Sequence, residues 1–581
     1  MKNLLVSFFK ANSTSKYSML GILFATALLS VSCTENPFGA TSNTEVEPEV
    51  KATITDNIHV AFAGGGWRAH TAHTAWTMSL LENNNHKLDN VFKNVESIGS
   101  NSGGSWFSTM LMYSPKFVSD IETIPLADWG DTKKGGWLGG QQNLFNDASV
   151  LGSGFACYAH AGSGDTYLLC VIGYYSGKHL NWNEAIKSLV FKDYSLGNLG
   201  LNTKPQKWAS GKSLLIASTM LTNNIVLNSS SSIPLAGYNQ YYQACVHGTA
   251  STHGKHGGSC SNGIANDVRP VTFSSVPSHL TSPPFFPELG TGKQISFAYS
   301  EQANNPYTGN ATIKNPVIND QVEIMHAAAA SSAALGFAAS ENISGGWDRS
   351  YATDNLALNF SLKNGVAKYD VAQDGTSVSD LASSVRVSLA DGGPTDNSGV
   401  AQLIPFLQLN NKDTGFNIVA FDNVQGHPFV PGENGAAVGN DIATLFGEAL
   451  CLGDKFCTGF NCDGTCVTVP ELQIFESAPI ETPITWSYSN EPSKYKNAPR
   501  LIYTKYIVKT TDNATFGIKK GSTGTLHAFT CYYPDAPTEP QNITKDGSFK
   551  AYNEMMQFIN TGLKANNNKG LTLLEKALGL K

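Results

Sequence analysis

Three consecutive glycines directly after a short apolar run constrain this chain more than any other feature of its sequence. They lie in HVAFAGGGWRAHTAH, which runs from His59 to His73. Glycine loses more backbone entropy on folding than any other residue, so a glycine run beside a core segment is costly unless backbone must approach something closely. The pattern predicts a buried strand over 59–63, a tight glycine turn, and a helix over 68–83.

A second turn of small residues follows in SIGSNSGGSWFSTMLMYS. A nucleophilic serine on a sharp strand-to-helix turn needs small residues two positions before and after it. Ser102 meets this requirement, with Ser100 behind it and Gly104 ahead. Ser100 itself follows an isoleucine by two positions, and Ser105 precedes Phe107 by two. Alone, the motif is also typical of a glycine-rich helix cap with Ser102 as its N-cap.

The glycine run could supply hydrogen-bond donors to such a serine. Ester cleavage builds negative charge on the carbonyl oxygen, and backbone N–H groups aimed at that oxygen stabilise it. Glycines that end a strand and open a helix can present these groups without side chains in the way. The alternative is a phosphate-binding loop, but Trp67-Arg68-Ala69 does not supply the Gly-Lys-Ser/Thr ending, and the dinucleotide spacing is also missing.

Asp391, in LADGG, is the candidate base. A serine hydroxyl is a weak nucleophile at neutral pH and needs a partner that removes its proton. Asp391 ends an apolar run and precedes two glycines, which allows a tight and partly buried position. Burial would raise its pKa and make it a better base. In isolation the same residue also fits an ordinary turn.

In this chain order, AGGGWRAH, SNSGGSW and ADGG resemble the catalytic domain of the cytosolic phospholipase A2 and fungal lysophospholipase family, and more distantly patatin. Those enzymes use a Ser-Asp dyad without histidine. The resemblance implies Ser102 as nucleophile and Asp391 as base. It also implies Gly65 and Gly66 as oxyanion-hole donors and Arg68 as the cation for the substrate phosphate. No metal or organic cofactor is implied.

Two departures from the family pattern bear on the substrate. Ser100 stands where the family usually has glycine, and no arginine lies between Asp391 and Asn423, where Lys412 is the only cation. A neutral lipid ester is therefore an alternative to a phospholipid or lysophospholipid. A non-catalytic cell-surface binding protein on the same scaffold is a further alternative.

Histidine could replace aspartate as the base, or bind a metal. His70 and His73 could share a helix face, but no third ligand is visible. A Ser…Asp…His order would permit a histidine after Asp391. We rank both alternatives below the Ser-Asp dyad. The histidines considered for them are His59, His70, His73, His326, His427 and His527.

The N-terminal segment predicts export. Residues 1–33 have lysines before a short apolar run that ends in small residues and Cys33, the layout of a bacterial lipoprotein signal or of a plain secretory signal. Residues 34–55 are polar and rich in proline and threonine, which favours a flexible tether. Residues 56–581 would form the catalytic domain, and membrane contact would come from a lipidated Cys33.

The other cysteines agree with an oxidising compartment, because most are near neighbours in sequence. We expect local disulfides between Cys157 and Cys170 and between Cys245 and Cys260, with one thiol left over. The alternative for the later cluster is a metal site, although its spacing is looser than that of usual zinc sites. The cysteines of that cluster are Cys451, Cys457, Cys462 and Cys466.

Strands alternating with helices predict an α/β fold with a central, mostly parallel sheet flanked by helices. Further strands are expected over 213–221 and 416–423, a small-residue helix over 323–340, and two short helices in the last forty residues. The middle of the chain would form a cap over the active site. The net charge of −7 and the scattered arginines argue against nucleic-acid binding.

Overall fold

The computed structural model describes the chain from residue 57 onward, with gaps. The N-terminal signal and tether lie outside the described residues, as do most of the predicted cap, His427 and every cysteine except Cys531. The described ranges are 57–146, 182–194, 196–221, 268–283, 297–301, 317–319, 322–333, 358–362, 386–424, 440–447, 472–476, 484–490, 498–537, 540 and 547–581.

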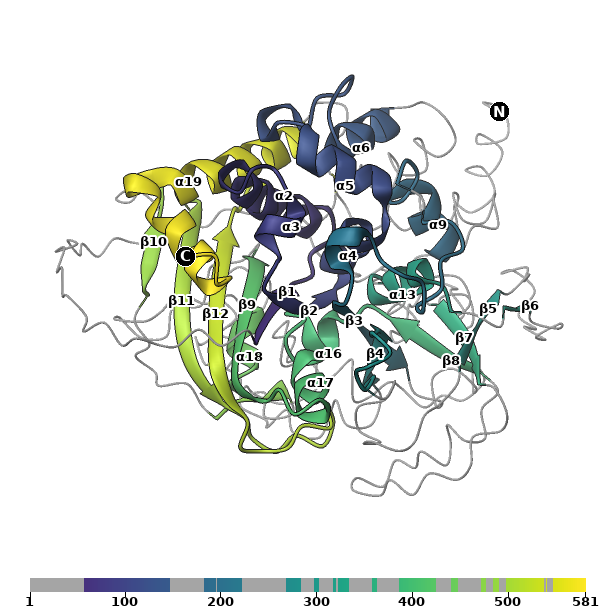
Figure 1. Cartoon of the computed structure of the whole chain (residues 1–581). Helices are drawn as coiled ribbons and strands as arrows, with labels where there is room; N and C mark the ends of the chain where they lie inside the picture. Colours follow the sequence, from purple (N-terminus) through teal and green to yellow (C-terminus); the bar gives the residue numbers. More distant parts are fainter. Residues whose placement is uncertain are drawn as a thin grey trace, which may run out of the picture.

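A single mixed sheet forms the centre of the molecule (Figure 1). Its middle strands run parallel in the order β12-β9-β1-β2-β3. Four of these strands were predicted from the sequence. They are the strand before the glycine run, the strand before Ser102, and the strands at 213–221 and 416–423. The bounds of the middle strands are β1 Ile58–Phe62, β2 Val95–Asn101, β3 Ser213–Leu221, β9 Thr414–Val424 and β12 Thr523–Tyr532. The expected α/β fold with a parallel centre is confirmed.

Antiparallel strands extend the sheet on both sides of this centre. On one side β11 pairs with β12, and β10 pairs with β11. On the other side β3 is followed by β8, β7, β5 and β6, while β4 also pairs with β3. The bounds are β4 Val268–Ser275, β5 Phe297–Glu301, β6 Val317–Asn319, β7 Leu358–Leu362, β8 Arg386–Ala390, β10 Trp486–Tyr488 and β11 Arg500–Lys509.

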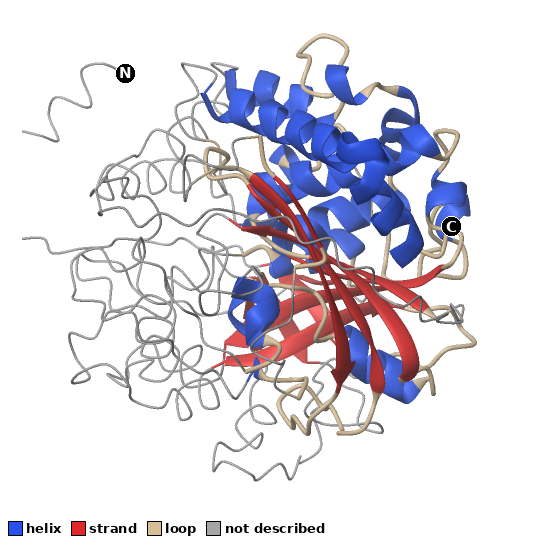
Figure 2. Ribbon diagram, turned by 90° about the vertical axis from the view of Figure 1, so that its left-hand side faces the viewer, coloured by secondary structure: helices blue, strands red, loops and turns tan. Residues whose placement is uncertain are grey.

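Helices cover the sheet in layers (Figure 2). Nearly every residue of α2 is buried, because the helix lies between the sheet and the long C-terminal helix α19. The described helices are α2 Gly66–Asn83, α3 Leu88–Val91, α4 Ser102–Tyr113, α5 Pro115–Thr123, α6 Trp137–Asn146, α9 Trp182–Leu189, α13 Ile324–Ser331, α16 Gly393–Asp396, α17 Leu403–Leu409, α18 Asn440–Thr444 and α19 Gly547–Ala577, with short 3-10 turns at Leu126–Asp128 and Lys207–Ala209.

Strand β2 separates α4 from α17. Successive side chains of a strand point to opposite faces of the sheet. Ser100 accepts a hydrogen bond from Ser108 of α4, whereas a Cβ on Gly99 would contact Leu403 of α17. Asn101, the last residue of β2, therefore points to the α17 face, and Ser102 begins α4 at the end of the strand.

The small-residue and C-terminal helices also form. Helix α13 packs against α4 and β3, as its alanine-rich sequence predicts, and the part of that prediction beyond residue 333 lies outside the described residues. Two C-terminal helices are present as well, because α19 is interrupted at 565–568 by non-helical backbone. Asn566, Asn567 and Asn568 adopt positive φ angles there.

No helix in the described part of the chain is long and apolar enough to cross a membrane. Cys531, the one cysteine in the described part, lies buried in β12 without a disulfide. The predicted disulfide pairs fall outside the described residues.

We predict that Gly104→Ala destabilises the fold. A Cβ on Gly104 would overlap the carbonyl oxygen of Phe62 and lie 2.7 Å from that of Ala63. Overpacking of this kind costs about 1–3 kcal/mol. The matched control is Gly140→Ala in α6, where the nearest atom, Asp193 Oδ2, is 3.5 Å away. The control should gain about 0.5–1 kcal/mol from the helix preference of alanine. Urea unfolding measures both, and equal effects would contradict the close contact between α4 and β1.

Candidate active site

The structure brings Ser102 and Asp391 together across 289 positions of sequence. The Ser102 hydroxyl donates a hydrogen bond of 2.8 Å to Asp391 Oδ2. Strand β3 explains the meeting, because it pairs with both supporting strands. Asn101 of β2 lies opposite Ala217, and Ala390 of β8 lies opposite Thr219. Strand β2 runs parallel to β3 and β8 runs antiparallel to it, so the C-terminal ends of β2 and β8 meet beside residues 217–219 of β3.

Ser102 lies on a strained turn. Its φ of 47° is in the left-handed region, which a residue other than glycine rarely adopts. Helix α13 holds the turn: Ser331 Oγ accepts the Ser102 N–H at 2.9 Å, and the Ser331 carbonyl accepts the Gly392 N–H at 3.2 Å. Ser331 therefore fixes the turns that carry both members of the pair.

Glycines make the close approach possible. A Cβ on Gly103 would overlap the carbonyl oxygen of Gly66 and lie 2.7 Å from its nitrogen. A Cβ on Gly392 would overlap Asn101 Oδ1 in the same way. The turns after β1 and β2 are thus packed backbone to backbone, and the turn after β8 packs against the side chain of Asn101 and the backbone of Ala217.

The glycine run leaves two backbone donors free. The Gly64 N–H donates to the Asn397 carbonyl oxygen at 2.8 Å. Gly65 and Gly66 adopt φ angles of 123° and 57°, and neither N–H has an acceptor among the residues that the structure describes. The Gly66 nitrogen is 2.7 Å from the place of a Cβ on Gly103, so this donor lies beside the residue that follows Ser102, and Gly65 precedes it in the chain.

Burial raises the pKa of Asp391 to about 6. Three hydrogen bonds to the carboxylate oppose this effect because they favour its charged form. They come from the Gly393 N–H at 2.8 Å, from Ser102 and from Asn101. Asp391 is only 8% exposed, so its base strength is set by the interior and not by solvent.

No family model and no curated protein matches the sequence. Among solved structures, human GIVD cytosolic phospholipase A2 is similar with a TM-score of 0.39 and 11% sequence identity. The likeness covers 90% of this chain and 63% of that one, so the chain spans less than two thirds of the structure it matches. A likeness at this level establishes neither family nor activity.

Arg68 lies in the first turn of α2 and is 6% exposed. Its Nε and Nη1 atoms are buried and have no hydrogen-bond partner in the described part of the chain. The carboxylates of Asp422 and Asp441 face it and partly offset the desolvation that lowers its pKa. Nη2 lies beside the backbone of Gly65, 3.1 Å from the place of a Cβ there. Arg68 is thus next to the glycine run, but within a charged interior cluster.

The other cation considered from the sequence, Lys412, lies at the far end of the sheet. It pairs with Glu96 near the start of β2, whereas Ser102 follows the last residue of that strand. A strand rises about 3.3 Å per residue, so roughly 20 Å of strand separates the two positions. Lys412 therefore cannot contact a substrate at Ser102.

The described histidines make their hydrogen bonds elsewhere. His59 bonds to Ser97 Oγ and Asn57, and His73 to the Ala63 carbonyl oxygen. His527 bonds to the Tyr503 hydroxyl on β11. His70 stacks on Trp137 with ring centroids 3.7 Å apart, and neither of its ring nitrogens has a partner among described residues. Burial lowers the pKa of each of these four histidines.

His326 is used locally, since its Nδ1 accepts the Glu323 N–H at the start of α13. No group of three or more His, Cys, Asp or Glu side chains in the described ranges could hold a metal ion.

Four polar residues around the pair were not predicted from the sequence. Asn101 precedes the serine, Ser331 comes from α13, Asn397 follows α16, and Asp441 lies on α18. They are linked by hydrogen bonds that span from 44 to 296 positions. The only local signal was the polar turn TDNSG shortly after Asp391.

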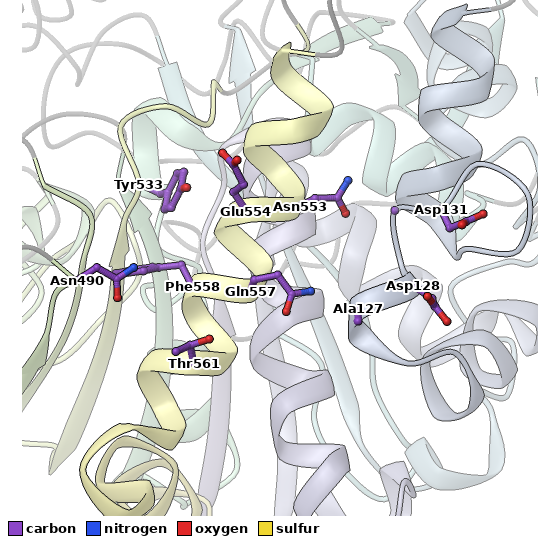
Figure 3. Close-up of a pocket in the computed structure, with 11 residues that line it drawn as sticks. Ala127, Asp128, Asp131, Asn490, Tyr533, Asn553, Glu554, Gln557, Phe558 and Thr561 are labelled. Atoms are coloured by element: carbon purple, nitrogen blue, oxygen red, sulfur yellow. The ribbon is translucent and has the colours of Figure 1, made fainter.

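A separate hollow of about 610 Å³ lies beside α19 (Figure 3). Eight of the eleven residues that line it are polar or charged, and none of them is among the residues around Ser102. Two of its carboxylates, Asp128 and Glu554, already pair with Lys134 and Lys550. The hollow is therefore distinct from the candidate site.

We predict that Asp391→Asn changes the pH dependence of stability. The folded pKa of Asp391, about 6, lies above the unfolded value, so its favourable contribution is complete below about pH 4 and is lost as the pH rises through about 6. Relative to the wild type, the variant should gain about 2 kcal/mol of unfolding free energy between about pH 4 and about pH 7, because a pKa difference of one is worth about 1.36 kcal/mol and the unfolded carboxyl is already about half-ionised at pH 4.

Urea unfolding across this pH range provides the measurement. Asp535→Asn, at an exposed position, is the matched control and should parallel the wild type. If Asp391→Asn also parallels the wild type, the carboxylate does not titrate in the buried setting described here.

Proposed function

We propose that the protein is a serine acyl hydrolase that cleaves fatty-acyl esters of phospholipids or lysophospholipids through an acyl-enzyme. The observation that carries the proposal is the hydrogen bond from Ser102 to Asp391, made on a left-handed turn beside two backbone N–H groups that have no acceptor among the described residues. A nucleophile, a base with a pKa near neutrality and a place for an oxyanion are the parts that acyl transfer requires.

In the first half of the proposed reaction, Asp391 takes the hydroxyl proton of Ser102 while Oγ bonds to the ester carbonyl carbon. The carbonyl π electrons move to oxygen, and the N–H groups of Gly65 and Gly66 stabilise the resulting charge. Collapse of the intermediate breaks the bond to the alcohol, which leaves with the proton from Asp391. Ser102 then carries the acyl group.

In the second half, a water molecule loses a proton to Asp391 and attacks the acyl carbon. The bond to Ser102 Oγ breaks, Oγ recovers the proton, and the fatty acid leaves. One carboxylate thus serves as base and then as acid in each half, and the proposed chemistry needs no metal or organic cofactor.

The phosphate of the substrate is assigned to Arg68 in this proposal. Its unpaired Nε and Nη1 atoms and its position beside Gly65 support the assignment. The facing carboxylates of Asp422 and Asp441 favour the second candidate, a neutral lipid esterase, because they offset the charge that a phosphate would need.

We further propose that the chain is exported and held at the membrane surface by lipid on Cys33. The segment 1–33 and the tether 34–55 lie outside the described residues, so this part rests on their sequence. A membrane-attached enzyme would meet lipid substrates directly, and no nucleic-acid partner is proposed.

We predict that a fluorophosphonate probe labels Ser102 and that Ser102→Ala and Asp391→Asn are not labelled. The labelling rate should fall below about pH 6, because Asp391 must be ionised to accept the proton. Mass spectrometry of the labelled peptide and rates across pH provide the measurements. Ser108→Ala, which removes a buried hydroxyl bonded to Ser100, is the control and should still label. Folded wild-type protein that never labels would instead support the non-catalytic binder.

A second prediction concerns the phosphate. If Arg68 binds it, Arg68→Lys should lower kcat/KM for a lysophospholipid by about 10- to 100-fold, since a hydrogen bond between charged groups is worth about 1.5–3 kcal/mol. The rate with a monoacylglycerol of the same acyl chain should change much less. Fatty-acid release from both substrates provides the measurement, and equal losses would favour the neutral lipid esterase.

A further inference from the structure

Asn397 contacts three separate parts of the structure through one residue. Its backbone carbonyl accepts the Gly64 N–H at 2.8 Å. Its side-chain Oδ1 accepts from Asn101 Nδ2 at 2.8 Å, and its Nδ2 donates to Asp441 Oδ2 at 2.7 Å. The glycine run, the residue before the nucleophile and helix α18 therefore meet at Asn397.

The side-chain amide is oriented by these partners. Asn101 offers a donor and Asp441 offers only acceptors when ionised, so the Asn397 oxygen must face the first and its nitrogen the second. A carboxylate at this position would have no donor for Asp441, and alanine would have neither group. Among side chains of this size, only an amide satisfies both neighbours.

The glycine run is pressed against this amide. A Cβ on Gly64 would overlap Asn397 Oδ1 and lie 3.0 Å from the Cβ of Ser102. The amide, the glycine run and the nucleophile turn are therefore in direct contact, with no space for a side chain at Gly64. Movement of Asn397 would therefore change the place of the free N–H groups relative to Ser102 Oγ.

Asp441 provides the other end of this support. It is half-buried on α18, and the guanidinium of Arg68 faces it across the cluster with Asp422. The glycine run is therefore bordered by Asn397 at Gly64 and by Arg68, which faces Asp441, at Gly65. Asp441 thus orients Asn397 and faces Arg68 from one position.

We propose that Asn397 is a positioning residue that fixes the glycine run against the nucleophile turn, and that Asp441 orients its amide. The inference rests on the proposed function, because the geometry matters only if the two N–H groups receive an oxyanion. Asn397 itself touches neither the Ser102 hydroxyl nor the Asp391 carboxylate in the described hydrogen bonds.

The test is the rate at which a fluorophosphonate labels Ser102, separated into probe affinity and the maximal rate constant. Asn397→Ala and Asn397→Asp should lower the maximal rate by about 10- to 100-fold and leave affinity nearly unchanged, because a misplacement of about 1 Å can cost about a hundredfold. Asp441→Ala should act in the same direction. Asp441→Asn should stay within about threefold, since its amide oxygen can still accept from Asn397.

Two comparisons separate positioning from general destabilisation. The double variant Asn397→Ala/Asp441→Ala should label no more slowly than Asn397→Ala alone, because both remove one linkage. Asn94→Ala is the matched control: it loses amide hydrogen bonds to the carbonyls of Leu578 and Gly579, far from the site, and should label at the wild-type rate. Thermal unfolding of every variant monitors the fold.

The results distinguish a failure of the proposed hydrolase function from a failure of the role of Asn397. Wild-type protein that does not label overturns the proposed function and this inference with it. A reactive wild type whose folded Asn397→Ala labels equally fast overturns the inference alone. If Asn397→Ala does not fold, the comparison of Asp441→Ala with Asp441→Asn decides, and equal rates for these two overturn the inference.

Discussion

The contact between two backbone turns is the constraint on which the site depends. Strands β1 and β2 are parallel neighbours, so the turns that follow them emerge side by side at one edge of the sheet. Gly103 then lies so close to Gly66 that a side chain at Gly103 would overlap the Gly66 backbone. This approach places free N–H groups next to a serine, and it explains why glycine runs are tolerated beside a core where they reduce stability.

The candidate base illustrates a balance between desolvation and hydrogen bonding. Burial raises the pKa of Asp391 and three hydrogen bonds lower it, and the net value is about 6. A carboxylate in water would be ionised but a weak base, whereas one buried without donors would stay protonated. The strained backbone of Ser102 is likewise stabilised by a hydrogen bond, because its N–H donates to Ser331 Oγ of helix α13.

Much of the fold and of the central pair could be predicted from the sequence because their signals are local. Glycines after an apolar run, small residues around Ser102 and glycines after Asp391 each reflect steric needs within a few residues. Asn101, Ser331, Asn397 and Asp441 gave no such signal. Their role comes from hydrogen bonds between distant elements, and an asparagine in a polar turn looks the same whether or not it has a partner across the fold. Strand β12, which is parallel to β9, and the antiparallel strands β10 and β11 were likewise not predicted.

Neutral amides separate the candidate dyad from the charged cluster behind it. Burial and the charge of Asp441 raise the pKa of Asp422 well above its usual value, so these two carboxylates affect each other. The pKa of Asp391 is set by burial and by its three hydrogen bonds, without a contribution from either carboxylate. Asn101 and Asn397 lie between, and an amide transmits position through its hydrogen bonds while carrying no net charge. A carboxylate at Asn397 would add a further negative charge next to Asp441 and bring that charge closer to the base. The amides of Asn101 and Asn397 therefore connect the site to Asp441 through hydrogen bonds, while the pKa of Asp391 stays independent of Asp422 and Asp441.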